Sequence, residues 1–256
     1  MSWAMRRKLL YGGVTALVAL IIILWIGFHF FATAPSCFDG KQDQGETGID
    51  CGGPCARICS DEARAPVVLW SRAFQTAPGV YTAAAYVENP NSAQNAGAYS
   101  VPYAFRLFDS NNVLIVERDG VMDIEPQQVV PVIEANIPTG TRTVAHTFFE
   151  FSTNAIQWTK IPQSSLPSIE VEGENLSSDG SSLSVSIVNA GDSAISNLTL
   201  AAVLFDASST AQAASESLLQ PIAPGSSQNV VFTWPSGVPN VIRAEITPLP
   251  ALPAQS

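Results

Sequence analysis

The sequence predicts a mainly β protein with an N-terminal transmembrane helix, a short disulfide-rich segment and two tandem antiparallel β-sandwiches. An uninterrupted apolar run covers residues 9–32, near the start of the chain. All four cysteines follow it within the segment 33–65. Beyond residue 66, short apolar runs recur about every 8–12 residues between turn signals, and this spacing is typical of a sandwich.

The apolar run is long enough to cross a membrane as a helix. Its 24 residues would rise about 36 Å, which exceeds the ~30 Å hydrocarbon core of a bilayer. The residues directly before it are basic, namely Arg6, Arg7 and Lys8. Aromatic residues suited to the membrane–water interface gather at its far end, namely Trp25, Phe28, Phe30 and Phe31. Because basic residues mark the cytoplasmic side, we expect a single-pass cell-membrane protein with a cytoplasmic tip at 1–8 and the bulk of the chain outside.

A cleaved secretory signal is the alternative interpretation of the same run. Ala32-Thr33-Ala34 fits the small-x-small cleavage pattern. However, the apolar run is longer than the ~7–15 residues of a signal sequence. Pro35 would also follow the scissile bond, where it should obstruct a peptidase. We therefore expect an uncleaved anchor.

The charge distribution limits the partners of the exported part. All 22 acidic residues follow the apolar run, whereas three of the 12 basic residues precede it. Residues 33–256 therefore combine nine basic with 22 acidic residues, for a net charge of −13. Such a surface repels phosphate backbones, so we expect no nucleic-acid partner.

The four cysteines predict two disulfides. They are Cys37, Cys51, Cys55 and Cys59, an even number in an exported segment. Three pairings are possible, and the spacing does not choose among them. So short a segment cannot bury a useful core, and disulfides are its source of order. Zinc is disfavoured, because two CxxxC spacings without a nearby histidine do not suit it.

The Cys-rich segment resembles a small module of many bacterial exported proteins. The residues that match its pattern, which runs DG, then GET, then DCGG, are Cys37, Asp39, Gly40, Asp43, Gly45, Glu46, Thr47, Asp50, Cys51, Gly52, Gly53 and Cys55. The spacing between Cys55 and Cys59 is one residue longer than the pattern expects. The resemblance implies no activity.

The same segment is a candidate calcium site. Its carboxylates lie among glycines on a turning loop, which suits a hard cation, and they are Asp39, Asp43, Glu46 and Asp50. Their spacing is not that of an EF-hand. The alternative is a solvated acidic loop ordered by disulfides and by side-chain turns. No other cofactor is predicted.

Two similar blocks follow, at 66–161 and 168–248, joined by a linker at 162–167. Four landmarks recur in the same order at offsets of 97 to 100 residues: Asn89 with Asn189, Phe108-Asp109 with Phe205-Asp206, Ile124 with Ile222, and Pro138 with Pro235. A period of ~100 residues is that of an immunoglobulin-like (Ig-like) sandwich. The Pro- and Ala-rich tail at 249–256 is predicted to be disordered.

The repeated blocks resemble FxLYD-type and CARDB-type domains, which are Ig-like modules of bacterial cell-surface proteins. Residues 105–109 (FRLFD) fit the FxLYD signature with Phe in place of Tyr, and the second block keeps Leu204-Phe205-Asp206. These families are mostly non-catalytic. The resemblance therefore implies a scaffold, adhesion or protein-interaction role.

The sequence carries no recognisable catalytic motif. It lacks the nucleophile elbow, the P-loop, the HExxH pair and the dinucleotide fingerprint, so we expect neither an enzyme nor a small-molecule substrate. We predict a membrane-anchored extracytoplasmic protein that binds other envelope or surface proteins. The alternative is a structural subunit of a secretion, pilus or transport assembly that packs through its transmembrane helix, in which Gly12, Gly13 and Ala16 form a small-residue patch.

Overall fold

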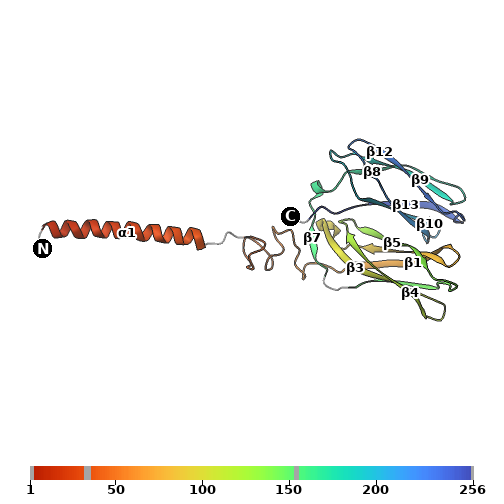
Figure 1. Ribbon diagram of the computed structural model, residues 1–256, viewed down its shortest axis with the longest axis horizontal. Helices are drawn as coiled ribbons and strands as arrows, with labels where there is room; N and C mark the ends of the chain where they lie inside the picture. Colours follow the sequence, from red (N-terminus) through yellow and green to blue (C-terminus); the bar gives the residue numbers. More distant parts are fainter. Residues whose placement is uncertain (1–2, 32–35, 153–155, 255–256) are drawn as a thin grey trace. The chain divides into compact units, whose positions relative to one another are not determined.

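The computed structural model describes residues 3–31, 36–152 and 156–254, with side chains described at 3–27, 36–152 and 156–254. The chain divides into two compact units, residues 1–55 and 56–256, which are treated separately below. In the first unit, helix α1 covers Trp3–Phe31 (Figure 1). It begins before the predicted run and includes the basic residues. Its apolar side chains are exposed, with Leu9 at 60% and Ile23 at 65%, so α1 is not the core helix of a globular domain.

The first sandwich consists of two antiparallel sheets. One has the order β1-β2-β5, with β1 at Val67–Ala77, β2 at Val80–Glu88 and β5 at Val129–Pro138. The other has the order β4-β3-β6, with β4 at Leu114–Ile124, β3 at Ala96–Phe108, β6 at His146–Phe151, and β7 (Trp158–Lys160) also paired with β3. Side chains that alternate along these strands meet between the sheets, and fully buried Phe105 and Leu107 lie at their centre.

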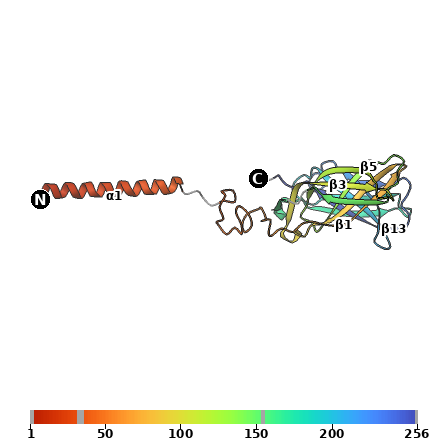
Figure 2. The ribbon, with the colours of Figure 1, turned by 90° about the horizontal axis from the view of Figure 1, so that it is seen from below.

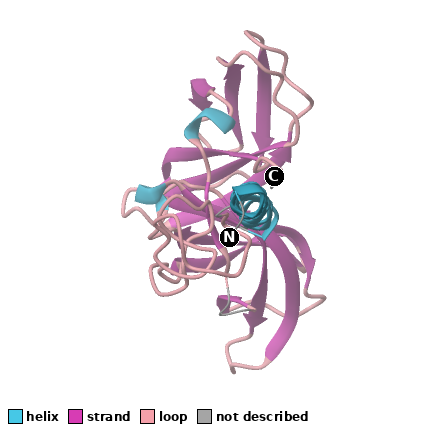
Figure 3. Cartoon of the chain, turned by 90° about the vertical axis from the view of Figure 1, so that its left-hand side faces the viewer, coloured by secondary structure: helices cyan, strands magenta, loops and turns pink. Residues whose placement is uncertain are grey.

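The second sandwich repeats this plan. One sheet has the order β12-β9-β8, with β8 at Ile169–Leu176, β9 at Ser182–Asn189 and β12 at Ser227–Thr233. The other has the order β11-β10-β13, with β10 at Leu198–Asp206, β11 at Ala211–Leu218 and β13 at Val241–Pro250. In the unit 56–256, the described helical segments are the 3-10 turns η1 (Ser92–Gln94) and η2 (Gln163–Ser165) (Figure 3). The mainly β prediction and its two antiparallel sandwiches are confirmed.

The two sandwiches share one topology. Strands β1 to β6 of the first correspond in order to β8 to β13 of the second, and each strand has the same neighbours in its sheet. Buried asparagines make the same contacts in both. Asn89 Nδ2 donates to the carbonyls of Ala96 and Glu125 at 2.8 and 3.0 Å. Asn189 Nδ2 donates to those of Ser193 and Ile222 at the same two distances. The internal duplication predicted from the landmarks thus has a structural counterpart.

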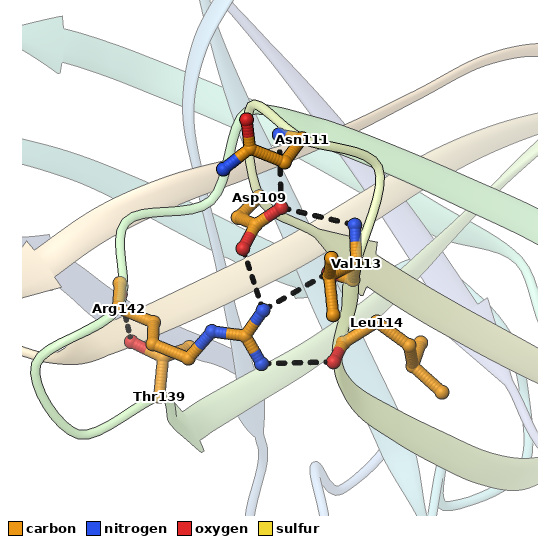
Figure 4. Close-up of polar contacts among 6 residues, drawn as sticks. All are labelled: Asp109, Asn111, Val113, Leu114, Thr139 and Arg142. Atoms are coloured by element: carbon orange, nitrogen blue, oxygen red, sulfur yellow. Dashed lines mark hydrogen bonds and ion pairs between the residues drawn. The ribbon is translucent and has the colours of Figure 1, made fainter.

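An aspartate closes the equivalent hairpin in each sandwich. Asp109 Oδ1 accepts the backbone N–H of Asn111 and of Val113, both at 2.9 Å (Figure 4). Arg142 reaches the other oxygen, Oδ2, at 2.6 Å and holds the pKa of Asp109 below its usual value. In the second sandwich, Asp206 forms the same turn. These contacts explain why the Phe-Asp step recurs.

The two sandwiches pack against each other through their inner sheets, so that four layers lie in the order β4-β3-β6, β1-β2-β5, β11-β10-β13 and β12-β9-β8. In Figure 1, β10 and β13 lie next to β5 and β1, and in Figure 2, seen from below, the first sandwich is in front. Strands β2 and β10 are therefore buried on both faces. In β2, Ala83, Ala85 and Val87 face their own core, whereas Ala84 and Tyr86 face the other sandwich. We call this contact between the inner sheets the seam.

Two predicted boundaries need correction. The tail at 249–256 is not disordered throughout, because β13 continues to Pro250, which pairs with Leu198 of β10. Leu252 is also buried, and the carbonyl of Pro253 accepts the Tyr99 hydroxyl at 2.9 Å. The Cys-rich segment, predicted to end at 65, divides at Cys55.

Residues 56–65 belong with the first sandwich. Ile58 is buried and donates its backbone N–H to the Trp158 carbonyl at 2.9 Å. The amide of Asn91 holds Arg64 through two hydrogen bonds, at 2.8 and 2.9 Å. These contacts add the end of the predicted Cys-rich segment to the sheet that contains β7.

Candidate functional site

The predicted disulfide residues are all oxidised. Cys37 is bonded to Cys55, and Cys51 and Cys59 are also disulfide-bonded. No cysteine in the described residues is free. Glu46 lies 2.9 Å from the Cys55 sulfur. Because both neighbouring sulfurs are used in a disulfide, the group of Cys37, Glu46 and Cys55 has no thiolate to offer a metal ion.

The predicted calcium ligands mostly bind the backbone of their own loop. Asp50 accepts the Gly40 N–H at 3.0 and 3.1 Å, and Asp39 accepts the Lys41 N–H at 3.0 Å. Glu46 accepts the Asp50 N–H at 3.2 Å. These contacts match the alternative in which the carboxylates order the loop.

Asp43 differs from the other three carboxylates. Its Oδ1 is occluded and has no hydrogen-bond partner among the described residues. Desolvation, followed by the charges of Asp39 and Glu46, raises the pKa of Asp43. Within the described chain, no three of the four predicted ligands bring oxygens within 4.8 Å of one another. Calcium binding therefore stays a prediction, and it would require the loop to rearrange.

The Cys37–Cys55 disulfide should decide whether this loop stays ordered. The bond spans 18 residues, and closing a loop of that size stabilises by roughly 3 kcal/mol in the chain-entropy model. In a Cys37→Ser/Cys55→Ser variant we expect trypsin to cut after Lys41 much faster than in the native chain. Cleavage within residues 56–256 provides the internal control and should not change. Equal rates at Lys41 would show that the loop is ordered by its hydrogen bonds alone.

The predicted membrane-interface residues lie at the end of α1. Trp25 is 64% exposed. The side chains of Phe28, Phe30 and Phe31 lie outside the described residues, as does the possible cleavage sequence at 32–35. One apolar helix near the N-terminus, Trp3–Gly27, could span a membrane or act as a signal sequence. The disulfides indicate a compartment outside the cytoplasm.

The seam contains an aromatic cluster that was not predicted from the sequence. Trp70 of β1 stacks on Tyr86 of β2 with ring centroids 4.6 Å apart. Phe205 of β10 meets both rings edge-on at 6.5 and 6.1 Å. On its other side, the Arg243 guanidinium lies 4.1 Å from the Phe205 centroid. Small side chains let the two sheets approach around this cluster, namely Ala84, Ala201, Ala211 and Ala214.

Polar contacts fix the register of the two sandwiches at the seam. The Tyr86 hydroxyl donates to Glu245 Oε2 at 2.9 Å, and Glu245 also pairs with Arg243. Burial, with this contact, raises the pKa of Tyr86, which therefore stays a donor at neutral pH. Gln127 Nε2 donates to the Pro248 carbonyl at 3.1 Å. The sequence did contain a signal that β2 and β10 are buried on both faces, because both are continuous apolar runs. An antiparallel strand with one solvated face instead alternates apolar and polar residues.

A Phe205→Leu variant measures the aromatic contribution to the seam. It keeps an apolar side chain but loses two edge contacts and the cation–π contact, and we expect the free energy of unfolding to fall by about 1.5–2 kcal/mol. Urea denaturation followed by tryptophan fluorescence measures this change. Phe148→Leu is the matched control, because Phe148 is 61% exposed on the outer sheet of the first sandwich and makes one edge contact there, with Phe108. Equal losses in the two variants would contradict a specific aromatic contribution.

The two outer faces carry charged side chains and differ from each other. On β3, Arg106 pairs with Glu117 at 2.6 Å and with Glu150 at 2.5 Å. On the outer sheet of the second sandwich, exposed Glu170 and Glu172 of the edge strand β8 lie beside β9. Charges on an edge strand protect it against sheet-to-sheet pairing. These faces are open for contact with partners.

Comparisons with known proteins add little to these observations. Neither a family model nor a curated protein matches the chain. Among solved structures, a red sea bream transglutaminase is 8% identical to this chain and covers 70% of it, at a TM-score of 0.21. The match spans 29% of that transglutaminase chain. A similarity at this level carries no argument about fold or activity.

Proposed function

We propose that this protein is a membrane-anchored, non-catalytic interaction protein whose residues 36–256 lie outside the cytoplasm. The observation that carries the proposal is α1, whose described apolar side chains are exposed and therefore need a lipid environment or a partner. The basic residues in its first turns favour a cytoplasmic N-terminus. The oxidised cysteines support export of the segment that follows.

The double sandwich is suited to presenting a binding surface to a partner protein. Residues 56–256 form one compact unit, and its seam is closed by aromatic and polar contacts. A rigid unit loses little conformational freedom when it binds a partner. The resemblance to Ig-like surface modules points to the same role. Partners would then be other proteins of the cell envelope or cell surface.

Protease treatment of spheroplasts tests the proposed orientation. Residues 36–256 should be digested from outside, whereas an epitope placed before Met1 should be protected until the membrane is lysed. Protection of both parts would contradict the proposal. The intact mass of the purified protein shows in the same preparation whether the chain is cleaved near residue 34.

A helix exchange separates the proposed function from the alternative, a subunit that assembles through its helix. One variant replaces residues 9–31 by an unrelated apolar helix of the same length, and a second lacks residues 56–256. After cross-linking in cells, the proposal expects partners to be retained by the first variant and lost by the second. The reverse result would favour the assembly subunit, in which Gly12 and Gly13 would form the packing face.

A further inference from the structure

An acidic cleft opens beside the seam, between the two sandwiches. Its volume is about 580 Å³, which is within the usual range for small-molecule sites. Four carboxylates line it, namely Asp123, Glu125, Glu134 and Glu216. None of the lining residues is a lysine, an arginine or a histidine. The cleft therefore concentrates negative charge without a counter-charge of its own.

The carboxylates form two pairs. At the end of β4, Asp123 accepts the Ser100 N–H at 2.8 Å, and its charge acts on Glu125. Glu134 of β5 accepts the Tyr103 hydroxyl at 2.7 Å, and across the seam its charge acts on Glu216 of β11. Desolvation, followed by the Glu134 charge, raises the pKa of Glu216. A cation bound nearby would therefore stabilise the ionised form of each pair.

Glu125 supplies an independent indication of a ligand. Its side chain is only 6% exposed, and its Oε2 has no hydrogen-bond partner among the described residues. Leaving a buried carboxyl oxygen unpartnered is costly. Burial, with the Asp123 charge, raises the pKa of Glu125 to about 8. Glu125 also lines the cleft, so a rotation of its side chain would present this oxygen to a donor group bound there.

The carboxylates of the cleft do not form a preformed cluster of three metal ligands. Among the described side chains, three potential metal ligands come within 4.8 Å of one another at Cys37, Glu46 and Cys55, and no such group lies in the cleft. A ligand with separated positive charges suits two acidic pairs better than one ion does. Apolar residues that also line the cleft, such as Val121, Val130 and Leu249, suit a methylene chain between those charges.

We propose that this cleft binds a linear alkyl diammonium compound, with one ammonium group at the Asp123–Glu125 pair and the other at the Glu134–Glu216 pair. Each ammonium has three N–H donors and no acceptor, which matches ionised carboxylates, so binding would release the proton that Glu125 holds at neutral pH. The proposal is independent of the proposed interaction role.

Calorimetric titration of the full chain in detergent micelles tests the proposal. The probes are 1,4-diaminobutane and 1,5-diaminopentane, and n-pentylamine is the matched single-charge control. We expect saturable 1:1 binding of at least one diamine and at least tenfold weaker binding of the monoamine. Absence of saturable diamine binding, or equal binding of the monoamine, would overturn the proposal. Calcium that binds at the cleft and displaces the diamine would overturn the two-charge geometry.

Two variants locate the bound diamine. Glu134→Gln and Glu216→Gln each remove one charge of the same pair, and each should weaken diamine binding at least tenfold. Glu170→Gln removes the same charge from an exposed outer strand and should leave binding unchanged. Circular dichroism checks that each variant is folded, and a diamine-dependent rise in Tm provides a second measurement of binding. Unchanged affinity in both cleft variants would place the ligand elsewhere and refute the assignment.

Discussion

A Glu125→Gln variant is expected to be more stable than the native chain at pH 8 and to lose much of its pH dependence. Glu125 is buried, and its pKa of about 8 lies above the ordinary value of 4.5. The folded state therefore binds this proton more tightly than the unfolded state does. The stabilising contribution is complete below about pH 4.5 and is lost as the pH rises through 8. A difference in pKa of this size corresponds to roughly 4–5 kcal/mol of unfolding free energy.

The comparison needs a control because other groups titrate in the same experiment. Desolvation raises the pKa of Glu216, which acts in the same direction, whereas Asp109 has a lowered pKa and acts in the opposite direction at lower pH. The measurement is therefore the difference in unfolding free energy between each variant and the native chain from pH 4 to 9. Glu174→Gln makes the same substitution at an exposed position and is the matched control. A difference for Glu125→Gln that does not change with pH would show that this carboxyl is not desolvated in solution.

Replacing Asn89 by Ala is expected to destabilise the chain by about 4 kcal/mol. The side chain is fully buried and makes three hydrogen bonds: its Nδ2 serves the carbonyls of Ala96 and Glu125, and its Oδ1 accepts the Asn91 N–H. The variant removes one hydrogen-bond partner from each of three buried backbone groups, and a buried group left unsatisfied costs about 1–3 kcal/mol before relaxation. Urea denaturation at constant pH measures the loss, which is large against a typical total of about 5–15 kcal/mol.

The equivalent residue of the second sandwich gives a graded test. Asn189 makes the corresponding three bonds, but those to Ser193 and Gly191 are only partly buried. Asn189→Ala should therefore cost less than Asn89→Ala, because water can replace part of what is lost. Asn111→Ala, at an exposed turn position, is the control. If Asn89→Ala costs less than about 1 kcal/mol, the low end for a single unsatisfied buried group, the corner is not held by this side chain.

Local patterns predict where most strands lie but not every boundary. The apolar run that ends at Phe205-Asp206 predicts a strand at 198–206, and β10 occurs there because Asp206 closes the hairpin. A second apolar run predicts a strand at 113–118, which corresponds to β4. It continues to Ile124 because the Tyr103 ring packs over Gly120, where an added Cβ would lie 2.4 Å from the ring. That contact joins residues far apart in the sequence, and no local pattern reveals it.

The side-chain contacts of the seam and of the cleft could not be predicted for the same reason. Glu125 follows a landmark isoleucine and precedes a proline, and nothing in that short pattern indicates that it is buried. Its burial depends on the fold around Asn89, whose amide contacts the Glu125 carbonyl. The pairing of Glu134 with Glu216 depends on the contact between two sandwiches. Cys37–Cys55 was one of the pairings left open, since it requires the loop conformation.

The packing of the sandwiches has a consequence for self-association. The seam joins non-equivalent sheets: β1-β2-β5 of the first sandwich meets β11-β10-β13 of the second, which corresponds to β4-β3-β6 of the first. A contact of this kind is head-to-tail, and repeating it would give either a closed ring or an open filament. Arg106 of β3 occupies the position that corresponds to Val203 of β10. Val203 lies at the seam, whereas Arg106 lies on the free outer face of the first sandwich.

The opposite free face shows the same change, because Ser184 and Ser186 occupy the positions that correspond to Ala84 and Tyr86. Polar side chains at these positions therefore oppose continuation of the head-to-tail series beyond two sandwiches. Apolar replacements of Arg106, Ser184 and Ser186 should favour self-association of the double sandwich.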